Sequence, residues 1–290
     1  MMAALSEPTV PALLGRYRPE SLVGRGGMAT IFRARDEILG REVALKVFRS
    51  GGQADMEQHH TELSALARLS HHGIVSLIDA GVDYSAPDDP RPFLVMELVS
   101  GSDLATTLAQ RRLSVREISE IAFDLAEALE YVHAQGVIHR DIKPSNVMLV
   151  EYGTSAFRAR ARLTDFGIAV DTSEPHPDES GVTTGTAAYL SPEQASHQQA
   201  TTASDIYSLG LVLLECFTGS IAFPGGIVDS ALARLQNDPP IPPDLPDDWS
   251  VLLTRMTARE PADRPDAAEL ALAFREAVIA AVGRHRQPEA

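Results

Sequence analysis

The sequence predicts an α+β chain in two parts, a small β-rich half followed by a larger, mostly helical half. Up to about residue 98, apolar residues alternate or run in short segments parted by Gly-containing turns, which is typical of strands. Beyond Gly101 the apolar period changes to 3.6, which is typical of helices. The 290 residues, 44% of them hydrophobic, can bury the cores of two medium lobes. We expect residues 97–102 to join the halves, with a ligand cleft between them.

The first half is predicted to contain five strands and one helix. The first three strands are expected to pair antiparallel because only short turns separate them. A helix is expected over about residues 55–69, where Leu63, Leu66 and Leu69 fall on one face. Residues 85–92 are rich in proline and aspartate, which is typical of an exposed loop. The predicted strands cover 17–23, 30–35, 42–47, 74–81 and 93–98.

Helices dominate the prediction for the second half, and few strands are expected there. Each predicted helix repeats its apolar residues every three or four positions. The chain shows no internal repeat. The predicted helices cover 103–111, 115–135, 202–218, 227–236, 247–257 and 266–282.

The composition excludes two classes of partner. A formal net charge of −15 and a pI near 5.0 argue against nucleic acid and anionic membranes, because both attract clustered Lys and Arg. Basic or neutral substrates are favoured instead. The single cysteine, Cys216, lies in an apolar stretch and cannot form an internal disulfide, so we expect a buried thiol in a reducing compartment.

The start of the chain does not resemble a signal peptide, because no basic residue precedes its short apolar stretch, which Glu7 and two prolines interrupt. We expect residues 1–15 to form a flexible leader. The longest apolar stretches are cut by charged residues such as Glu215, so no membrane span is predicted. A soluble, cytoplasmic protein is therefore expected.

Two polar motifs carry the strongest functional signal. The first is His139-Arg140-Asp141-Ile142-Lys143-Pro144-Ser145-Asn146, and Asp165-Phe166-Gly167 begins nineteen residues after its Asn. A strand hairpin between them would bring Asn146 and Asp165 together. One carboxylate would then serve a substrate hydroxyl, and the Asn-Asp pair would serve magnesium, which indicates phosphoryl transfer.

These motifs resemble the catalytic loop and metal-binding motif of eukaryotic-like (Hanks-type) bacterial serine/threonine protein kinases, and the resemblance extends over nearly the whole chain. It implies a kinase-like fold, with one main helix in an N-lobe of about residues 16–98 and a C-lobe of about 99–283. Residues 284–290 are then a C-terminal tail. The resemblance implies that Asp141 accepts or orients the substrate proton, that Lys143 neutralises the transferring phosphate, and that Asn146 and Asp165 hold Mg²⁺, with Mn²⁺ as the alternative.

A glycine-rich segment is expected to lie over the phosphates of ATP. Residues 24–31 fall between the first two predicted strands, where a hairpin can present backbone to a ligand. Alone, such a segment is equally typical of an ordinary turn, and Ala29 stands where the family has its third glycine. The resemblance assigns nucleotide contacts to Gly24, Arg25, Gly26, Gly27, Met28, Ala29, Thr30 and Ile31, and further to Ala44, Met96, Glu97 and Val99.

A lysine and a glutamate complete the implied nucleotide site. Val43-Ala44-Leu45-Lys46 matches the family's third strand, so Lys46 is expected to pair with the α- and β-phosphates of ATP. Glu62 in the following helix is the matching carboxylate that would orient Lys46. Glu57 lies on the same helix and is the alternative, since either acid could instead be a solvated surface residue. Met96 could likewise be a core filler.

The segment from Gly185 to Glu193 resembles the part of the family that docks the acceptor peptide. With Lys143, Thr186 points to Ser and Thr as acceptors, and Ser191 replaces the usual alanine. Three further matches are architectural: Glu193 with Arg264 as a buried ion pair, and Asp205 as the brace of the catalytic loop. His139 and Phe166 are expected to pack rather than to act chemically.

Residues between Gly167 and Gly185 are expected to regulate activity. They are rich in hydroxyls, and Arg140 could pair with an added phosphate, so we expect autophosphorylation at Thr183 or Thr184 to activate the enzyme. The alternative is that these threonines are only solvated loop residues.

Two further patterns have plain interpretations. His59-His60 and His71-His72 lack the acids or cysteines of a metal site, so surface and turn positions are expected. Arg158, Arg160 and Arg162 alternate along a predicted strand. That basic stripe is expected to be a solvated strand face, with a docking patch for an acidic partner as the alternative.

The resulting hypothesis is a kinase that transfers the γ-phosphoryl group of ATP to Ser and Thr hydroxyls of proteins, itself included. Two alternatives are a catalytically weak scaffold of the same fold and a small-molecule kinase. The scaffold is disfavoured because Lys46, Asp141 and Asp165 are all present. The docking segment disfavours the small-molecule kinase. The substrate, the upstream signal and the oligomeric state are not predicted.

Overall fold

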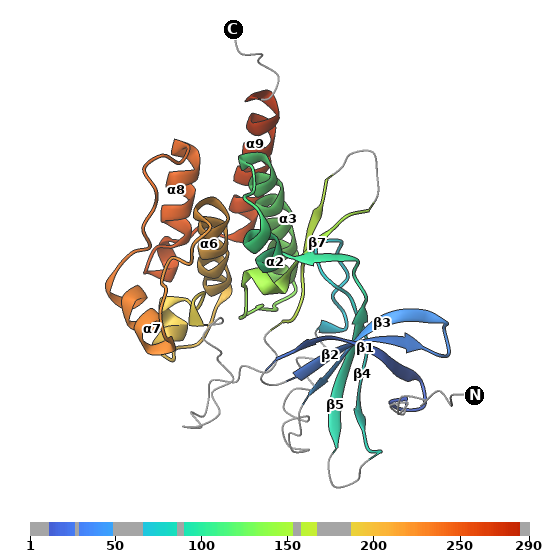
Figure 1. Cartoon of the computed structure of the whole chain (residues 1–290). Helices are drawn as coiled ribbons and strands as arrows, with labels where there is room; N and C mark the ends of the chain where they lie inside the picture. The colour runs from blue at the N-terminus through green and yellow to red at the C-terminus, as the bar shows by residue number, and fades with distance from the viewer. Residues whose placement is uncertain are drawn as a thin grey trace, which may run out of the picture. The chain divides into compact units, whose positions relative to one another are not determined.

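The computed structural model describes residues 12–26, 29–48, 66–85, 90–152, 158–166 and 187–284 (Figure 1). The chain divides into two compact units. The first comprises residues 1–69 with 75–99, and the second comprises residues 70–74 with 100–290.

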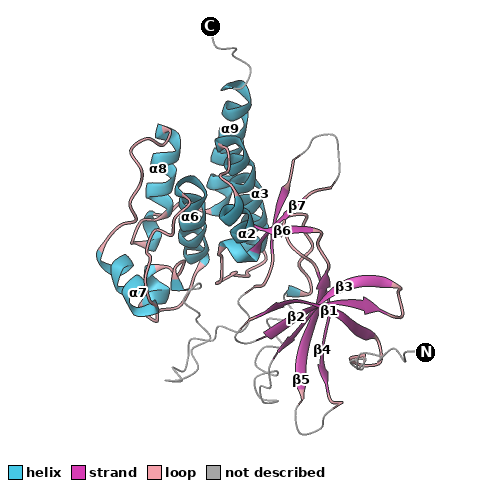
Figure 2. Ribbon diagram, in the orientation of Figure 1, coloured by secondary structure: helices cyan, strands magenta, loops and turns pink. Residues whose placement is uncertain are grey.

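The first unit is built on a five-stranded antiparallel sheet with strand order β1-β2-β3-β5-β4 (Figure 2). This confirms the predicted strands, although β4 starts later than Ile74, which instead forms a bridge to Leu163 in the second unit. The predicted helix over 55–69 lies outside the described residues up to Ala65; Leu66 is helical, and Ala67 and Arg68 form a turn. The strands are β1 Tyr17–Arg25, β2 Ala29–Asp36, β3 Arg41–Phe48, β4 Leu77–Asp83 and β5 Arg91–Glu97.

One face of this sheet carries the core of the unit. The period of two along β3 places Val43 and Leu45 on that face, and both are fully buried. Leu13, from the segment expected to be a leader, is buried in the same core and pairs with Tyr17. The buried members of the core are Leu13, Tyr17, Ala34, Val43, Leu45, Phe93 and Val95.

A charged pair fastens the entry of the chain to this sheet. Arg16 donates from Nε and a terminal nitrogen to the two oxygens of Asp36, at 2.9 and 2.8 Å. These bonds hold the pKa of the Asp36 carboxyl well below its usual range. Tyr17 donates its hydroxyl to Asp79 at 2.6 Å. The two contacts fix the first residues of β1 against strands β2 and β4.

The second unit combines a three-stranded antiparallel sheet, ordered β6-β7-β8, with most of the helices. Gly101 begins β6 with φ +156, and an added Cβ would lie 2.1 Å from the carbonyl oxygen of Leu149, so only glycine fits there. All six predicted helices are confirmed, whereas β6 was not predicted. The elements are β6 Gly101–Asp103, β7 Val147–Val150, β8 Arg160–Leu163, α2 Leu104–Gln110, α3 Val115–Ala134, η1 Pro144–Asn146, α5 Pro192–Ala195, α6 Thr202–Thr218, α7 Ile227–Gln236, α8 Asp247–Met256, η2 Pro261–Asp263 and α9 Ala267–Arg284.

Helices α3 and α6 form the centre of this unit. Helix α3 packs against α9, β8 and α6, and α6 also packs against α8. Most of α6 is buried, including the thiol of Cys216, which confirms the prediction for that residue. Trp249 of α8 stacks on Phe274 of α9 with ring centroids 5.2 Å apart. No helix in the described part of the chain is long and apolar enough to cross a membrane.

Both interpretations of the arginine stripe were wrong. Arg158 donates to Asp124 of α3 at 2.6 Å, and Arg160 lies 3.6 Å from the same carboxylate. Arg162 is buried and donates to the carbonyl oxygen of Ile74 at 2.6 Å. Asp124 is itself fully buried. The arginines therefore tie β8 to α3 and to residue 74 rather than forming a solvated or docking face.

Candidate active site

The β7–β8 hairpin brings together Asn146 of the first polar motif and Asp165 of the second. Val147 pairs with Leu163, and the backbone N–H of Thr164 donates to the carbonyl oxygen of Asn146 at 3.0 Å. Asp165 follows directly. The predicted hairpin is therefore confirmed, and the amide nitrogen of Asn146 lies 3.5 Å from the carbonyl oxygen of Asp165.

Three of the predicted site residues contact one another through Asp141. Lys143 donates from Nζ to Asp141 Oδ2 at 2.8 Å. Asn146 donates from Nδ2 to the same Oδ2 at 2.9 Å and to the Asp141 carbonyl oxygen at 2.8 Å. The side chains of Asp141 and Lys143 remain 16% and 19% exposed. Asp141 Oδ1 takes part in neither side-chain bond, so it is available to a hydroxyl donor.

Asp205 of α6 holds the backbone ahead of Asp141, as predicted. Its carboxylate accepts from the backbone N–H groups of His139 and Arg140, both at 2.9 Å, and from Nε2 of His133 at 2.8 Å. Arg140 has φ 66, in the left-handed region that costs energy for any residue except glycine. Because the Asp205 carboxylate is buried, its bonds offset that cost and fix where Asp141 points.

His139 is a packing residue, as expected. Its side chain is fully buried, and burial lowers the pKa of the imidazole, which keeps it neutral. Nε2 donates to the carbonyl oxygen of Thr164 at 3.2 Å, and Nδ1 faces the backbone N–H of Asp141 at 3.4 Å. The ring lies 4.4 Å, centroid to centroid, from that of Phe166. His139 thus joins the two motifs without an exposed nitrogen for proton transfer.

The oxygen atoms of Asn146 and Asp165 suit a hard divalent cation. The hydrogen bonds of Asn146 to Asp141 use its amide nitrogen, so Oδ1 is the atom of this side chain that could bind a cation. The described residues contain no group of three or more His, Cys, Asp and Glu that could enclose a metal. Mg²⁺ usually binds one or two protein oxygens, and water and phosphate oxygens complete its coordination shell in place of an all-protein cage. The donor set therefore fits Mg²⁺.

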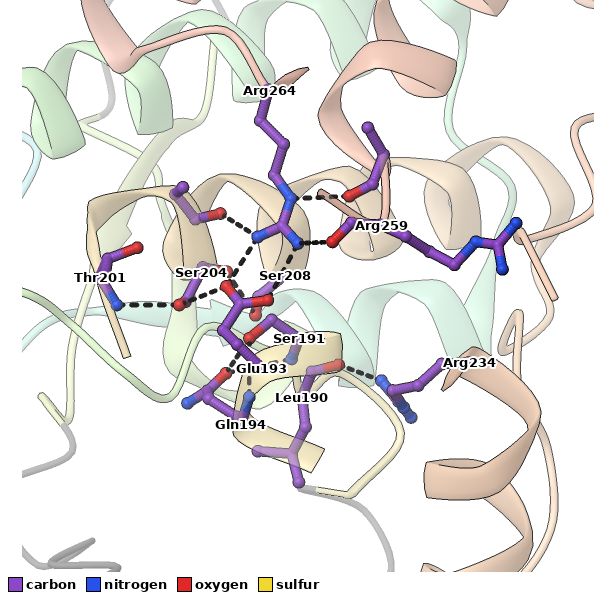
Figure 3. Close-up of polar contacts among 12 residues, drawn as sticks. Leu190, Ser191, Glu193, Gln194, Thr201, Ser204, Ser208, Arg234, Arg259 and Arg264 are labelled. Atoms are coloured by element: carbon purple, nitrogen blue, oxygen red, sulfur yellow. Dashed lines mark hydrogen bonds and ion pairs between the residues drawn. The ribbon is translucent and has the colours of Figure 1, made fainter. Parts of the chain in front are cut away.

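The predicted ion pair between Glu193 and Arg264 is confirmed (Figure 3). Arg264 donates from its two terminal nitrogens to the two carboxylate oxygens, at 2.7 and 2.9 Å. Ser204 donates to the same carboxylate at 2.6 Å. Although burial alone would raise the pKa of Glu193, these hydrogen bonds lower it below its ordinary value. The pair closes the end of the expected docking segment against α6.

Ser191 and Gln194 form a capping box that the sequence reasoning missed. Ser191 Oγ accepts from the Gln194 backbone at 3.3 Å, and Gln194 Oε1 accepts from the Ser191 backbone at 3.1 Å (Figure 3). Gln194 also donates from Nε2 to the carbonyl oxygen of Arg140 at 3.1 Å. The start of α5 is thus joined to the catalytic loop. The spacing Ser-Pro-Glu-Gln is the sequence signal that predicts such a box.

Tyr189 is a second residue that the sequence reasoning did not single out. It is buried, and its hydroxyl donates to the carboxylate of Glu215 in a short hydrogen bond. Its carbonyl oxygen accepts from Ser208 at 2.7 Å. Burial and the bond to Glu215 raise the pKa of the phenol well above its usual value. Both contacts connect the docking segment to α6.

In the first unit, several predicted nucleotide residues share one face of the sheet. Gly24 pairs with Ile31, and Ile31 pairs with Lys46, so the three residues form a row across β1, β2 and β3. Ala44 lies two residues from Lys46 and pairs with Met96 of β5, on the same face. This face is opposite the one that carries the buried Val43, Leu45 and Val95.

The glycine positions leave space above the hairpin. Among the described residues, an added Cβ at Gly24 would meet no atom within 4 Å, and one at Gly26 would meet only the carbonyl oxygen of Ala29, at 3.6 Å. Packing among the described residues therefore does not require glycine at either position. The exposed backbone at Gly24 and Gly26 suits close approach of a phosphate group.

Some of the remaining predicted residues lie within the described part of the chain, and the others lie outside it. Arg25 and Thr30 pair across the hairpin, Ala29 is buried, and Met96 is buried within β5. Glu97 ends β5, with its N–H donating to the carbonyl oxygen of Ser76 at 3.0 Å, and Val99 follows it. Outside the described residues lie Gly27, Met28, Glu57, His59, His60, Glu62, Thr183, Thr184 and Thr186.

Comparisons with known proteins point to one family. A family model described as "Protein kinase domain" matches residues 17–273. The chain is 37% identical over 258 residues to serine/threonine-protein kinase PknA of Mycobacterium tuberculosis, covering 87% of this chain and 58% of PknA. It is 38% identical over 271 residues to the DNA damage-responsive serine/threonine-protein kinase RqkA of Deinococcus radiodurans, covering 89% of this chain and 39% of RqkA.

A solved structure supports the fold. The crystal structure of a double mutant of the Mycobacterium tuberculosis PknI kinase domain matches with a TM-score of 0.72 and 24% identity, covering 96% of this chain and all of that one. At this level of identity the likeness shows the fold alone. The chain spans 58% or less of the length of the two curated relatives named above.

Proposed function

Because the chain belongs to the protein kinase family, and within it to the bacterial serine/threonine kinases, we propose that it transfers the γ-phosphoryl group of ATP to Ser and Thr hydroxyls of proteins. We take the kinase domain to run from residue 16 to 283. Basic or neutral acceptor proteins suit the net charge of −15 better than acidic ones do.

The contact set around Asp141 carries this proposal. A carboxylate that receives Lys143 Nζ and Asn146 Nδ2 on one oxygen has its other oxygen free of those bonds. In the proposed reaction Asp141 Oδ1 accepts a hydrogen bond from the acceptor hydroxyl and orients its lone pair for in-line attack. Asp205 and Asn146 fix the position of Asp141, so little reorganisation is needed when the substrate arrives.

The other site residues stabilise charge. Lys143 lies beside Asp141, so its ammonium group is placed to offset negative charge on the transferring group. Lys46, in its row with Gly24 and Ile31, is proposed to bind the α- and β-phosphates, with Glu62 as its orienting carboxylate. When bound, ATP supplies the phosphoryl group and Mg²⁺ or Mn²⁺ neutralises its oxygens. Asn146 Oδ1 and the Asp165 carboxylate would hold the cation.

Nucleotide selection is assigned to the sheet face of the first unit. Arg25, Gly26, Gly27, Met28, Ala29 and Thr30 are proposed to cover the phosphates with Gly24 and Ile31. Ala44 and Met96, opposite one another on β3 and β5, would contact the adenine ring, because both present small or apolar surface. Glu97 and Val99 would bind the ring edge through their backbone.

Autophosphorylation is the proposed route of activation. Thr183 and Thr184 are the candidate acceptors, and Arg140 is the candidate partner of the new phosphate. No observation favours the alternatives of a scaffold or a small-molecule kinase. Lys46, Asp141, Asn146 and Asp165 are all retained, and the curated relatives named above are serine/threonine-protein kinases.

The proposal is tested by following the intact mass of the purified chain during incubation with MgATP. The wild type is expected to gain phosphate. Peptide mapping is expected to locate that phosphate at Thr183 or Thr184. Lys46→Met and Asp141→Asn should gain none, whereas Arg255→Met, a change of an exposed arginine on α8, should behave as the wild type. A wild type that binds nucleotide but phosphorylates neither itself nor an added protein would contradict the proposed function.

A further inference from the structure

Arg234 is a fully buried arginine of α7 whose side chain reaches into the docking segment. One terminal nitrogen donates to the carbonyl oxygen of Leu190 in a short hydrogen bond (Figure 3). The other donates to the carbonyl oxygen of Ala187 at 2.6 Å and to Ser230 Oγ at 2.7 Å. Nε donates to the Ser230 carbonyl oxygen at 3.1 Å. All three guanidinium nitrogens are thus occupied.

The charge of Arg234 is compensated in an unusual way. Within the described part of the chain, none of its hydrogen-bond partners is a carboxylate; each is a carbonyl or a hydroxyl oxygen. Burial lowers the pKa of the guanidinium to about 10, so it remains a cation at neutral pH. Burying an unpaired cation is costly. A residue that only filled this space could be apolar, so the hydrogen bonds to backbone are the reason to keep arginine here.

The geometry of the docking segment explains what the guanidinium does. Ala187 is helical and residues 188 and 189 form a turn, and the last carbonyl groups of a helix lack partners within the helix. The planar fork of arginine can reach two carbonyl oxygens at once, which the single ammonium of lysine cannot do in the same way. Ser208 of α6 holds the carbonyl oxygen between them, that of Tyr189, at 2.7 Å. Three backbone carbonyls of residues 187–190 are therefore fixed by side chains of α6 and α7.

We propose that Arg234 is a positioning residue for acceptor recognition: it fixes the backbone of residues 187–190 and so sets the affinity for the protein substrate without touching it. This inference rests on the proposed function and on the resemblance of residues 185–193 to the acceptor-docking segment of the protein kinase family. Arg234 has no contact with Asp141, Lys143, Asn146 or Asp165 among its bonds. Its loss should therefore affect the acceptor and leave the use of nucleotide largely unchanged.

The test is steady-state kinetics of the full chain with MgATP and myelin basic protein as the acceptor. Arg234→Met keeps the length of the side chain and removes every donor. It is expected to lower kcat/KM for the acceptor by about tenfold to a hundredfold, mainly through KM. The KM for ATP should change by less than about twofold. Arg234→Lys, which restores the charge and part of the bonding, should recover part of the loss.

A matched control separates positioning from general destabilisation. Leu270→Ala removes a fully buried side chain of α9 and should lower the melting temperature without changing the acceptor KM. An acceptor KM for Arg234→Met equal to that of Leu270→Ala would overturn the inference.

Hydrogen exchange of the backbone amides of residues 185–193 gives a readout that does not depend on activity. Faster exchange in Arg234→Met than in the wild type and Leu270→Ala supports the hold on this segment, and equal exchange overturns it. If the wild type transfers no phosphate to any protein, the proposed function fails, and with it the role in acceptor recognition. Exchange still decides whether Arg234 holds the segment.

Discussion

Arg264 and Arg234 are two buried arginines that hold the same segment with different partners (Figure 3). Arg264 pairs with a carboxylate, that of Glu193, and so each charge of the pair compensates the other. Arg234 binds the carbonyl oxygens of Ala187 and Leu190, which carry no net charge. Arg264 also donates to the carbonyl oxygens of Ala203, Ala258 and Arg259. Both arginines therefore bind backbone, and among the described residues the difference is the carboxylate that pairs with Arg264.

The difference between the partners of Arg264 and Arg234 predicts that loss of one damages the fold and that loss of the other damages only the site. Without Arg264, the buried carboxylate of Glu193 is left uncompensated, which is strongly unfavourable. Without Arg234, two carbonyl oxygens lose donors, but no charge is left behind and the freed turn can move toward water. Loss of Arg264 should therefore lower global stability, whereas loss of Arg234 should mainly loosen residues 187–190.

The largest effect is expected from Arg264→Met. Its free energy of unfolding should fall by about 3–5 kcal/mol, because a buried ion pair loses one partner. Urea unfolding monitored by Trp249 fluorescence measures this, since that side chain is buried in the same unit. The double variant Arg264→Met with Glu193→Gln should recover part of the loss. A loss below about 1 kcal/mol would place the pair among weakly contributing surface bridges instead.

A smaller loss is expected from Arg234→Met. Two buried carbonyl groups lose hydrogen bonds, so the free energy of unfolding should fall by about 1–3 kcal/mol. The same urea series measures it, with Arg255→Met as the control for removal of an exposed arginine. If Arg234→Met were as destabilising as Arg264→Met, the distinction between the two arginines would be lost.

The capping box at α5 should have a more modest effect. Ser191→Ala removes the acceptor of the Gln194 backbone N–H, at a cost of about 1 kcal/mol in stability. Ser191→Thr, which keeps a capping hydroxyl in this fully buried position, should lose less. Differential scanning calorimetry of the three proteins compares them. A melting temperature for Ser191→Ala equal to that of the wild type would show that this box does not stabilise the fold.

The smallest effect is expected from pH. Hydrogen bonds from Arg264 and Ser204 lower the pKa of Glu193 in the folded chain below its ordinary value of 4.5. The stabilisation is then fully present above pH 4.5 and is lost as pH falls through the folded pKa. The difference in stability between wild type and Glu193→Gln should therefore shrink on acidification below pH 4.5. A difference in stability that grows on acidification would contradict the assigned lowering of the Glu193 pKa in the folded chain.

The sequence predicted the fold well where its signals are local. The period-2 alternation around Val43 and Leu45 and the 3.6 period of α3 both matched the structure, because each element buries one face. The start of β4 was misplaced because Ile74 bridges to Leu163, which lies far away in sequence. The three-residue β6 gave no periodic signal. Short elements that depend on distant partners are not readable from local pattern.

The candidate site was likewise predicted where its signals are local and missed where they depend on distant partners. The residues around Asp141 were predicted because they fall in two contiguous motifs. The stripe of Arg158, Arg160 and Arg162 was misread because its partner, Asp124, lies on a helix more than thirty residues earlier. Arg234 was not predicted at all, since an arginine in an amphipathic helix is most often exposed. Its role depends on carbonyl groups that only the folded chain brings near.

The most direct test of the account is the rate at which Asp141→Asn phosphorylates an added acceptor protein, compared with the wild type. We predict that kcat falls by about 10²–10⁴-fold while the affinity for MgATP changes by less than about twofold. That result would place Asp141 at the reacting hydroxyl rather than at the nucleotide. A variant that keeps the wild-type rate would contradict the proposed role of Asp141 and the reading of the catalytic loop built on it.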